Sequence, residues 1–255
     1  MNVLLLRFDA PLLSFGGTAV DAKNVTDEMP SRSMITGLLG NALGYEHRDV
    51  MALSRLQERL RVCARRDREG ARIVDFHTVD LGHDFLAEGW TTWGQVEGRE
   101  GGTAGSGTHI RYRHHLADAI YTVAVTIEPA GEPPTLEDIE AALNAPARPL
   151  FLGRKACLPS VPISMGIVEA ESALDALRVA PLGDRRRYRR QSLAADERRE
   201  CLVRVHGGMS MPAVPSFRER AVTENRDWPN QIHVGRSVVH EALIECGASA
   251  PTENT

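Results

Sequence analysis

Hydrophobic and polar residues follow two periods along this chain, and each period predicts one type of element. Apolar residues at every third or fourth position predict helices at 32–43, 50–60 and 135–143. Apolar runs and two-residue alternation predict strands at 2–9, 60–66, 71–81 and 120–129, with a short strand inside 148–163. The polar turn DREG at 67–70 predicts a hairpin between the strands at 60–66 and 71–81.

The segment 82–107 interrupts this regular pattern. It is rich in glycine and carries Phe85, Trp90 and Trp93, so it is too polar for a core and long for a loop inside a compact domain. Loops of this kind are usually functional arms or disordered segments. We interpret 82–115 as an insertion into the surrounding fold.

The order of the predicted elements indicates a fold class. Strand, helix, hairpin, arm, strand, helix and strand follow one another as in a ferredoxin-like α+β unit with an insertion. We therefore predict an α+β protein with a ferredoxin-like, RRM-related core at 1–168 and a glycine-rich thumb at about 82–115. A small, mainly-β C-terminal region at 169–240 packs on this core, and a flexible tail occupies 241–255.

The helix at 32–43 contains two interior glycines. Gly44 is suited to a C-terminal cap, but Gly37 and Gly40 each weaken a helix by about 0.8–1 kcal/mol relative to alanine. Two explanations are open. The bare helix face allows RNA, a neighbouring subunit or the sheet to approach the backbone, or the glycines only permit tight packing on the strand at 2–9.

Composition and charge exclude several classes of protein. The 42% hydrophobic content is that of an ordinary globular protein, and no run of about 18 apolar residues exists, so we predict no membrane partner. The opening residues look like a strand and not a signal peptide, and the four cysteines form no CxxC pair, so we expect a cytoplasmic protein. The net charge of −4 argues against a non-specific nucleic-acid binder.

The basic residues are unusual in kind. Of 30 lysines and arginines only Lys23 and Lys155 are lysines, and arginine offers a planar fork that suits phosphate and guanine. An arginine run at 185–199 is either a phosphate-contacting face or a solvated helix with its own acidic partners. Basic and aromatic residues also interleave in and after the arm, as single-stranded nucleic acid binding requires, although a solvated loop packed on the body has the same composition.

Catalytic and metal-binding motifs are absent from the sequence. It has no P-loop, no nucleophile elbow, no GxGxxG after a strand and no HExxH, and its nine histidines are not spaced as metal ligands. We predict no cofactor and no metal. His77, on a strand, is either a general base or a residue without a chemical role.

Three segments together resemble the CasD family of CRISPR-associated proteins. They are MPSRSMITGLLGNALG at 29–44, DFHTVDLG at 75–82 and PLFLGRKAC at 149–157, in the family's order. The opening LLLRFDAPLLSFG at 4–16 and the strand IYTVAVTIEP at 120–129 are also similar. The resemblance spans about residues 2–168 and is weaker in the last third of the chain.

The resemblance implies a member of the repeat-associated RNA-binding superfamily. Such a subunit of a type I-E Cascade grips the repeat-derived 5′ handle of crRNA, and its thumb packs on the neighbouring backbone subunit. The implied partners are crRNA, the backbone subunit CasC, the large subunit CasA and other Cascade proteins, with target DNA reached only through the complex. A separate subunit, CasE, cuts the RNA, so this chain is expected to be non-catalytic.

The resemblance also implies which residues contact RNA and the neighbouring subunit. We predict RNA contacts at Ser31, Arg32, Ser33, Gly37, Gly40, His77, Gly153, Arg154 and Lys155. We predict thumb contacts with RNA and the neighbouring subunit at Trp93, Arg99, Arg111 and Arg113. The alternative is a metal-independent endoribonuclease that processes pre-crRNA, as type I-C relatives do, with Tyr45, His77, Arg154 and Lys155 as its candidate residues.

Overall fold

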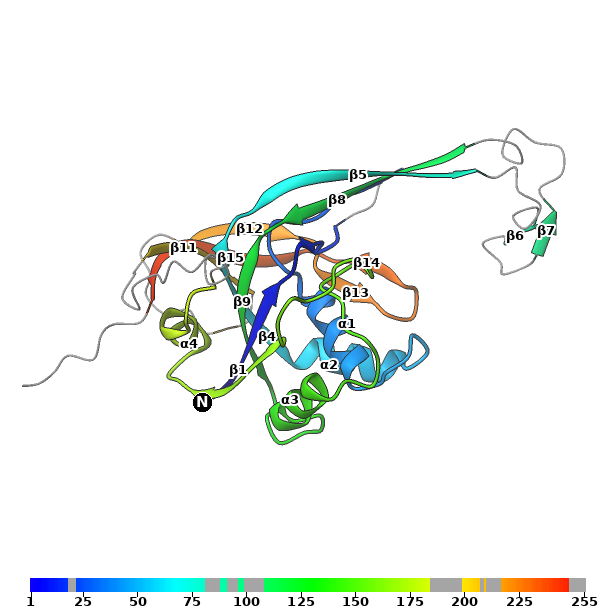
Figure 1. Ribbon diagram of the computed structural model, residues 1–255. Coiled ribbons are helices and arrows are strands. Elements are labelled where there is room, and N and C mark those ends of the chain that lie inside the picture. The colour runs from blue at the N-terminus through cyan, green and yellow to red at the C-terminus, as the bar shows by residue number, and fades with distance from the viewer. Residues whose placement is uncertain are drawn as a thin grey trace, which may run out of the picture.

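A seven-stranded antiparallel sheet forms the centre of the computed structural model (Figure 1). The structure describes residues 1–17, 22–80, 88–90, 96–98, 108–183, 199–206, 209 and 217–247. The strand order is β10-β1-β9-β4-β11-β15-β12. The strands are β1 (Asn2–Asp9), β4 (Leu60–Arg68), β9 (Ile120–Ile127), β10 (Ser164–Glu169), β11 (Arg199–His206), β12 (Arg218–Val222) and β15 (Ser237–Cys246).

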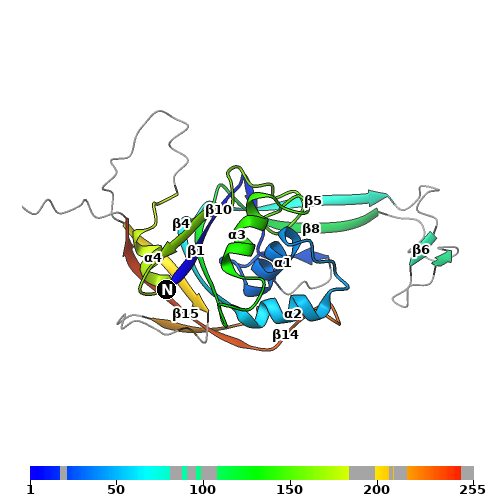
Figure 2. The ribbon, with the colours of Figure 1, turned by 90° about the horizontal axis from the view of Figure 1, so that it is seen from below.

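Helices cover both faces of this sheet. Three of them, α1 (Arg32–Ala42), α2 (Val50–Arg59) and α3 (Leu136–Asn144), group together in Figure 2, and α4 (Ala173–Val179) lies apart from them. The strand β1 shows why both faces are covered, because its alternate side chains enter two different cores. The mixed α+β architecture with a large antiparallel sheet and few helices agrees with the predicted α+β class.

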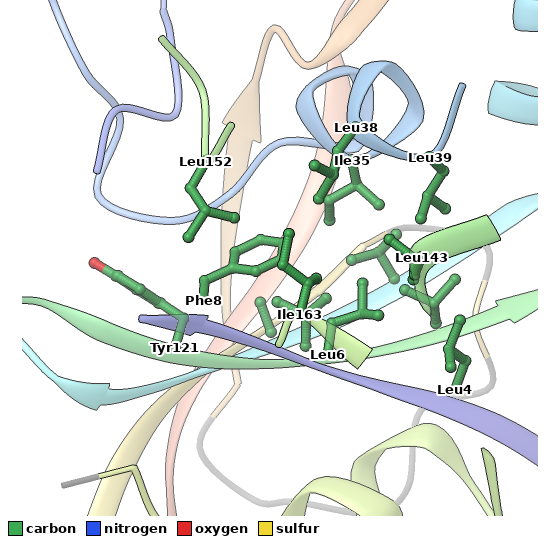
Figure 3. Close-up of a cluster of buried hydrophobic side chains, with 14 of the residues drawn as sticks. Leu4, Leu6, Phe8, Ile35, Leu38, Leu39, Tyr121, Leu143, Leu152 and Ile163 are labelled. Atoms are coloured by element: carbon green, nitrogen blue, oxygen red, sulfur yellow. The ribbon is translucent and has the colours of Figure 1, made fainter. Parts of the chain in front are cut away.

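The larger core lies between α1 and the sheet. Figure 3 shows side chains from β1, β9, α1 and α3 meeting in this space. Its labelled members are Leu4, Leu6, Phe8, Ile35, Leu38, Leu39, Tyr121, Leu143, Leu152 and Ile163. The predicted helices at 32–43, 50–60 and 135–143 are confirmed, and the last begins with the expected Thr135 cap, completed by Asp138 into a capping box.

A two-stranded ribbon projects from one end of the sheet (Figure 1). It consists of β5 (Ala71–Asp80) and β8 (Thr108–Ala117), paired antiparallel over their whole length. Two short strands support β8 near the sheet: β2 (Leu12–Leu13) runs antiparallel to it and β3 (Lys23–Asn24) runs parallel. The segments β6 (Glu88–Trp90) and β7 (Val96–Gly98), within the predicted arm, pair with each other.

The predicted hairpin between 60–66 and 71–81 is wrong. β4 pairs with β9 and β11, whereas β5 leaves the sheet to pair with β8. The turn before β5 requires glycine, because the φ of Gly70 is +70° and a Cβ at this residue would lie 2.3 Å from Ala117 O. The hairpin partner of β4 is therefore distant in sequence, and the ribbon lies between the two.

Two further expectations differ from the structure. The segment 148–163 contains no strand, because Leu152 and Cys157 are buried in a tight loop closed by a 2.8 Å bond from Leu152 N to Cys157 O. The expected tail at 241–255 begins too early, since β15 continues through Cys246, whose side chain is buried in the core under α4. No helix in the described part of the chain is long and apolar enough to cross a membrane.

The hairpin of β13 (Asn225–Asp227) and β14 (Ile232–Val234) lies beside α1 and α2. The amide of Gln57 in α2 binds it twice, donating to Arg226 O at 3.0 Å and accepting from Arg226 N at 3.0 Å. The hairpin therefore fixes Trp228, which follows β13, next to the glycine face of α1.

Candidate nucleic-acid interface

The ribbon has one charged face. Asp75 lies opposite Arg113 and His77 lies opposite Arg111, and directly opposed residues of an antiparallel pair share a face. The His77 imidazole contacts the Asp75 carboxylate through Nε2 and Oδ2. Two arginines on one exposed face supply the planar donors that bind phosphate, so this face is suited to a nucleic-acid backbone.

The opposite face of the ribbon carries an exposed apolar patch. Val74 and Phe76 are each 54% exposed, and Tyr112, directly across from Phe76, is 39% exposed. The rings of Phe76 and Tyr112 pack with centroids 5.4 Å apart, and Ile110 extends the same face. Exposed apolar residues in one patch mark an interaction surface, so the two faces of the ribbon offer different chemistries.

The loop that carries the predicted residues Gly153, Arg154 and Lys155 lies at the base of the ribbon. Gly153 has a φ of +107°, and a Cβ there would lie 1.6 Å from Ser14 O. The Arg154 guanidinium donates to His114 O on β8 and to Asn24 O on β3, both at 2.8 Å. Lys155 is exposed. The structure thus brings this loop together with the strand that carries Arg111 and Arg113.

A buried histidine lies beneath Arg154. His115 Nε2 is 3.5 Å from Arg154 Nη1, and His115 Nδ1 is 3.7 Å from the buried Cys157 Sγ. Burial, reinforced by the charge of Arg154, lowers the pKa of His115, and burial raises the pKa of the Cys157 thiol. The raised pKa favours the protonated thiol at neutral pH.

The N-terminus of α1 uses its polar groups within the protein. Ser31 caps the helix by accepting from Met34 N at 3.2 Å, and Ser33 N donates to Glu224 O at 3.1 Å. The Ser31 and Ser33 hydroxyls are buried, 3.2 Å apart. RNA contacts were predicted at Ser31 and Ser33, and in the structure the Ser31 hydroxyl and the Ser33 N–H group already have partners within the protein.

Arg32 points toward a buried acid. Its Nη2 is 3.7 Å from Glu224 Oε1, and Glu224 also contacts the buried His206. Burial alone would raise the pKa of Glu224, but the contact with His206 and the charges of His206 and Arg32 hold it below its usual value. Sequence reasoning missed Glu224 and His206, because no local pattern links them to α1.

The two interior glycines of α1 have different surroundings. A Cβ at Gly40 would lie 2.7 Å from Leu53 Cδ2, so a side chain there would require Leu53 of α2 to move. A Cβ at Gly37 would lie 3.8 Å from Trp228 Cη2, which is an ordinary contact. The close packing expected against the strand at 2–9 is in fact packing against α2, and Gly37 lines a pocket of about 510 Å³ beside Tyr45 and Trp228.

Some predicted residues do not join these groups. Trp93, Arg99 and most of the arginine run at 185–199 lie outside the described residues. Asp75 was not predicted, although its two-residue spacing from His77 on a strand was a usable signal. Among the described residues, no three His, Cys, Asp or Glu side chains cluster as metal ligands.

Comparisons with known proteins agree on one family. A family model described as CRISPR-associated protein (Cas_Cas5) matches residues 3–240. The CRISPR system Cascade subunit CasD of Escherichia coli (strain K12) is 29% identical over 176 residues, which cover 69% of this chain and 75% of that protein.

Two solved structures share the fold. A chain of a structure described as "CRISPR RNA-guided surveillance complex" superposes with a TM-score of 0.68 at 24% identity, covering 99% of this chain and 95% of that one. A second, described as "Crystal structure of Cas protein", gives a TM-score of 0.63 at 25% identity, covering 98% and 99%. The match of the family model to residues 3–240 shows that this protein belongs to the CRISPR-associated Cas_Cas5 family.

Proposed function

We propose that this chain is a non-catalytic RNA-binding and assembly subunit of a Cascade-like CRISPR complex, holding the 5′ handle of crRNA. The observation that carries the proposal is the two-faced ribbon, with Arg111 and Arg113 on one face and Phe76 and Tyr112 on the other. One face suits RNA and the other suits a protein. The relationship to CasD, a Cascade subunit, supports the same interpretation.

The strand order supports a ferredoxin-like core for this subunit. Within the large sheet, β10-β1-β9-β4 are neighbours, and helices connect β1 to β4 and β9 to β10. The proposal interprets this order as the βαββαβ arrangement of a ferredoxin-like unit. In the proposal, residues 1–168 form this RNA-binding core, the ribbon is the inserted thumb, and the strands after residue 169 pack on the core as extra strands.

Recognition in this proposal is electrostatic and shape-dependent. Arg111, Arg113 and Lys155 contact phosphates, which position the RNA without reading its sequence. The apolar face docks on the neighbouring backbone subunit CasC, and other Cascade proteins, including the large subunit CasA, complete the assembly. Target DNA is then read by base pairing with the guide and reaches this chain only through the complex.

One observation favours the endoribonuclease alternative. The His77 imidazole contacts the Asp75 carboxylate, and a carboxylate that orients a histidine is a common feature of general bases. The other candidates fit less well, because the Arg154 guanidinium is engaged by backbone carbonyls and Tyr45 lines the pocket beside Trp228. Cleavage of the cognate repeat RNA by the isolated protein in EDTA would favour this alternative.

The proposal is tested by copurification. The tagged chain is co-expressed with its genomic neighbours and a repeat–spacer array, and the bound RNA is sequenced. We expect uniform 5′ ends that carry repeat-derived sequence, together with other Cascade subunits. The R111A/R113A double variant should lose RNA, and its affinity should depend less on salt, with a slope smaller by about 0.7 for each phosphate that the variant no longer binds.

The matched control is R236A, which removes an exposed arginine far from β8 in sequence. It should bind RNA as the wild type does. Absence of defined RNA from the wild-type complex would overturn the proposal. Equal losses of bound RNA in R236A and R111A/R113A would show that the ribbon is not the RNA-binding surface.

A further inference from the structure

Arg154 joins two strands that meet at the base of the ribbon. Its Nη1 donates to His114 O of β8 at 2.8 Å, and its Nη2 donates to Asn24 O at 2.8 Å and to Val25 O at 3.4 Å. One planar guanidinium therefore spans the end of the parallel β3–β8 pair. A single ammonium is a point charge that does not reproduce this fork.

The backbone on either side of Arg154 is held firmly. Ser14 N donates to Leu152 O at 3.2 Å, and Cys157 N donates to Arg154 O at 2.8 Å. The approach of Gly153 to Ser14 O leaves no room for a side chain. The guanidinium is thus carried by a loop that is locked to the core, so it has a fixed position from which to hold a strand.

The strand that Arg154 holds is the one that carries the charged face. His114 follows Arg113 directly, and Arg113 is paired in register with Asn24 of β3. The same region is closed by the bond from Tyr112 N to Ala22 O at 2.9 Å. Movement of β8 at this point would change the direction of the whole ribbon, because β5 is paired with β8 throughout its length.

We propose that Arg154 is a positioning residue that fixes the direction in which the ribbon leaves the sheet, whereas the neighbouring Lys155 is a phosphate contact. This inference rests on the proposed function, since it assigns a task to the RNA-contacting ribbon. Arg154 was predicted to contact RNA directly. In this inference it instead controls where Arg111 and Arg113 meet the RNA. The two adjacent cations then have different tasks.

The first test needs no RNA. Hydrogen exchange of backbone amides is measured in the free R154A, R154K and K155A variants. We expect the Tyr112 amide to exchange at least tenfold faster in R154A, with most of that increase retained in R154K, and no change in K155A. Wild-type exchange in both Arg154 variants would overturn the inference. If R154A does not fold, the exchange rate of the Tyr112 amide in R154K, which keeps the charge, decides this test.

The second test measures RNA binding against salt. A phosphate contact by Arg154 predicts that R154A lowers the salt slope by about 0.7 and that R154K restores both slope and affinity. The positioning role predicts an unchanged slope in R154A, a different set of RNA nucleotides crosslinked by a photoreactive residue at position 111, and no rescue by R154K. K155A should lower the slope. Rescue by R154K would overturn the inference.

The two proposals fail in different ways. If the wild-type protein binds no repeat-derived RNA, the proposed function is wrong, and the exchange experiment still decides whether Arg154 positions the ribbon. If RNA binding is present and the Tyr112 amide is unaffected in the Arg154 variants, the proposed function stands and the positioning role is wrong.

Discussion

Gly40 of α1 lies against Leu53 of α2 so closely that a Cβ at residue 40 would be 2.7 Å from Leu53 Cδ2. Leu53 is buried, so its side chain has little room to move. Gly37 has no such neighbour, because its nearest contact for a Cβ is Trp228 Cη2 at 3.8 Å. The two interior glycines of one helix therefore have different causes, and only one of them is explained by packing within the chain.

Substitution by alanine separates the two glycines. G37A should raise the free energy of unfolding by about 0.8–1 kcal/mol through helix propensity. G40A should lower it by up to about 2 kcal/mol, because overpacking against Leu53 outweighs the same gain. Denaturant unfolding followed by circular dichroism measures both. Equal stabilisation by the two variants would contradict the contact with α2, and unchanged RNA binding by G37A would remove Gly37 from the predicted RNA contacts.

Gly153 should tolerate no side chain. G153A combines a positive φ with a Cβ placed 1.6 Å from Ser14 O, so we expect a loss of at least about 2 kcal/mol in the free energy of unfolding. K155A, at an exposed position in the same loop, should stay within about 0.5 kcal/mol of the wild type. Thermal and denaturant unfolding give the comparison, and a stable G153A protein would show that the loop does not approach Ser14.

Acid should weaken the base of the ribbon through His115. Its pKa is lowered in the folded protein, so the unfolded chain binds the proton more tightly and stability falls as the pH drops below about 6.5. The Glu224 carboxyl, whose pKa is also lowered, acts in a separate window below about 4.5. Between pH 7.5 and 5, the free energy of unfolding should decline less steeply in H115Q than in the wild type. Parallel curves would exclude His115 as the cause.

The apolar face of the ribbon should matter for protein partners more than for folding. Phe76 is 54% exposed, so F76S should change the free energy of unfolding by less than about 1 kcal/mol. The same variant should lower the amount of other Cascade subunits that copurify with the tagged chain. V79S is the matched control, since Val79 is 45% exposed and lies on the charged face with His77. Quantitative mass spectrometry of the complex measures both, and equal losses would argue against two distinct faces.

Local patterns were enough to predict most elements. The helices at 32–43 and 135–143 were predictable because their caps and apolar stripes lie within the segments themselves. The β4–β9 pairing was not predictable, because the DREG turn is a good local hairpin signal and the true partner follows a long insertion. The contacts of Arg154 with Asn24 and His114 join three distant segments, and no composition or spacing in any one of them indicates the others.

The same limit applies to the start of α1. Ser31 and Ser33 form a motif that suits a phosphate as well as it suits a cap, and the choice depends on Glu224, which is remote in sequence. The charged face of the ribbon was partly predictable, since Arg111 and Arg113 alternate on one strand. Their partners across the ribbon depend on the register of β5 with β8.

The position of β4 in the sheet has a consequence for synthesis of the chain. β4 lies between β9 and β11, so on a ribosome its second edge stays open until residues 199–206 have emerged. β11 in turn needs β15, the last strand of the sheet to be made. An open edge is a template for pairing with other chains. The nascent protein is therefore most exposed to aggregation after β4 has been made and before β15 has been made. Ribosome pausing inside this window would therefore affect yield more than pausing before residue 60.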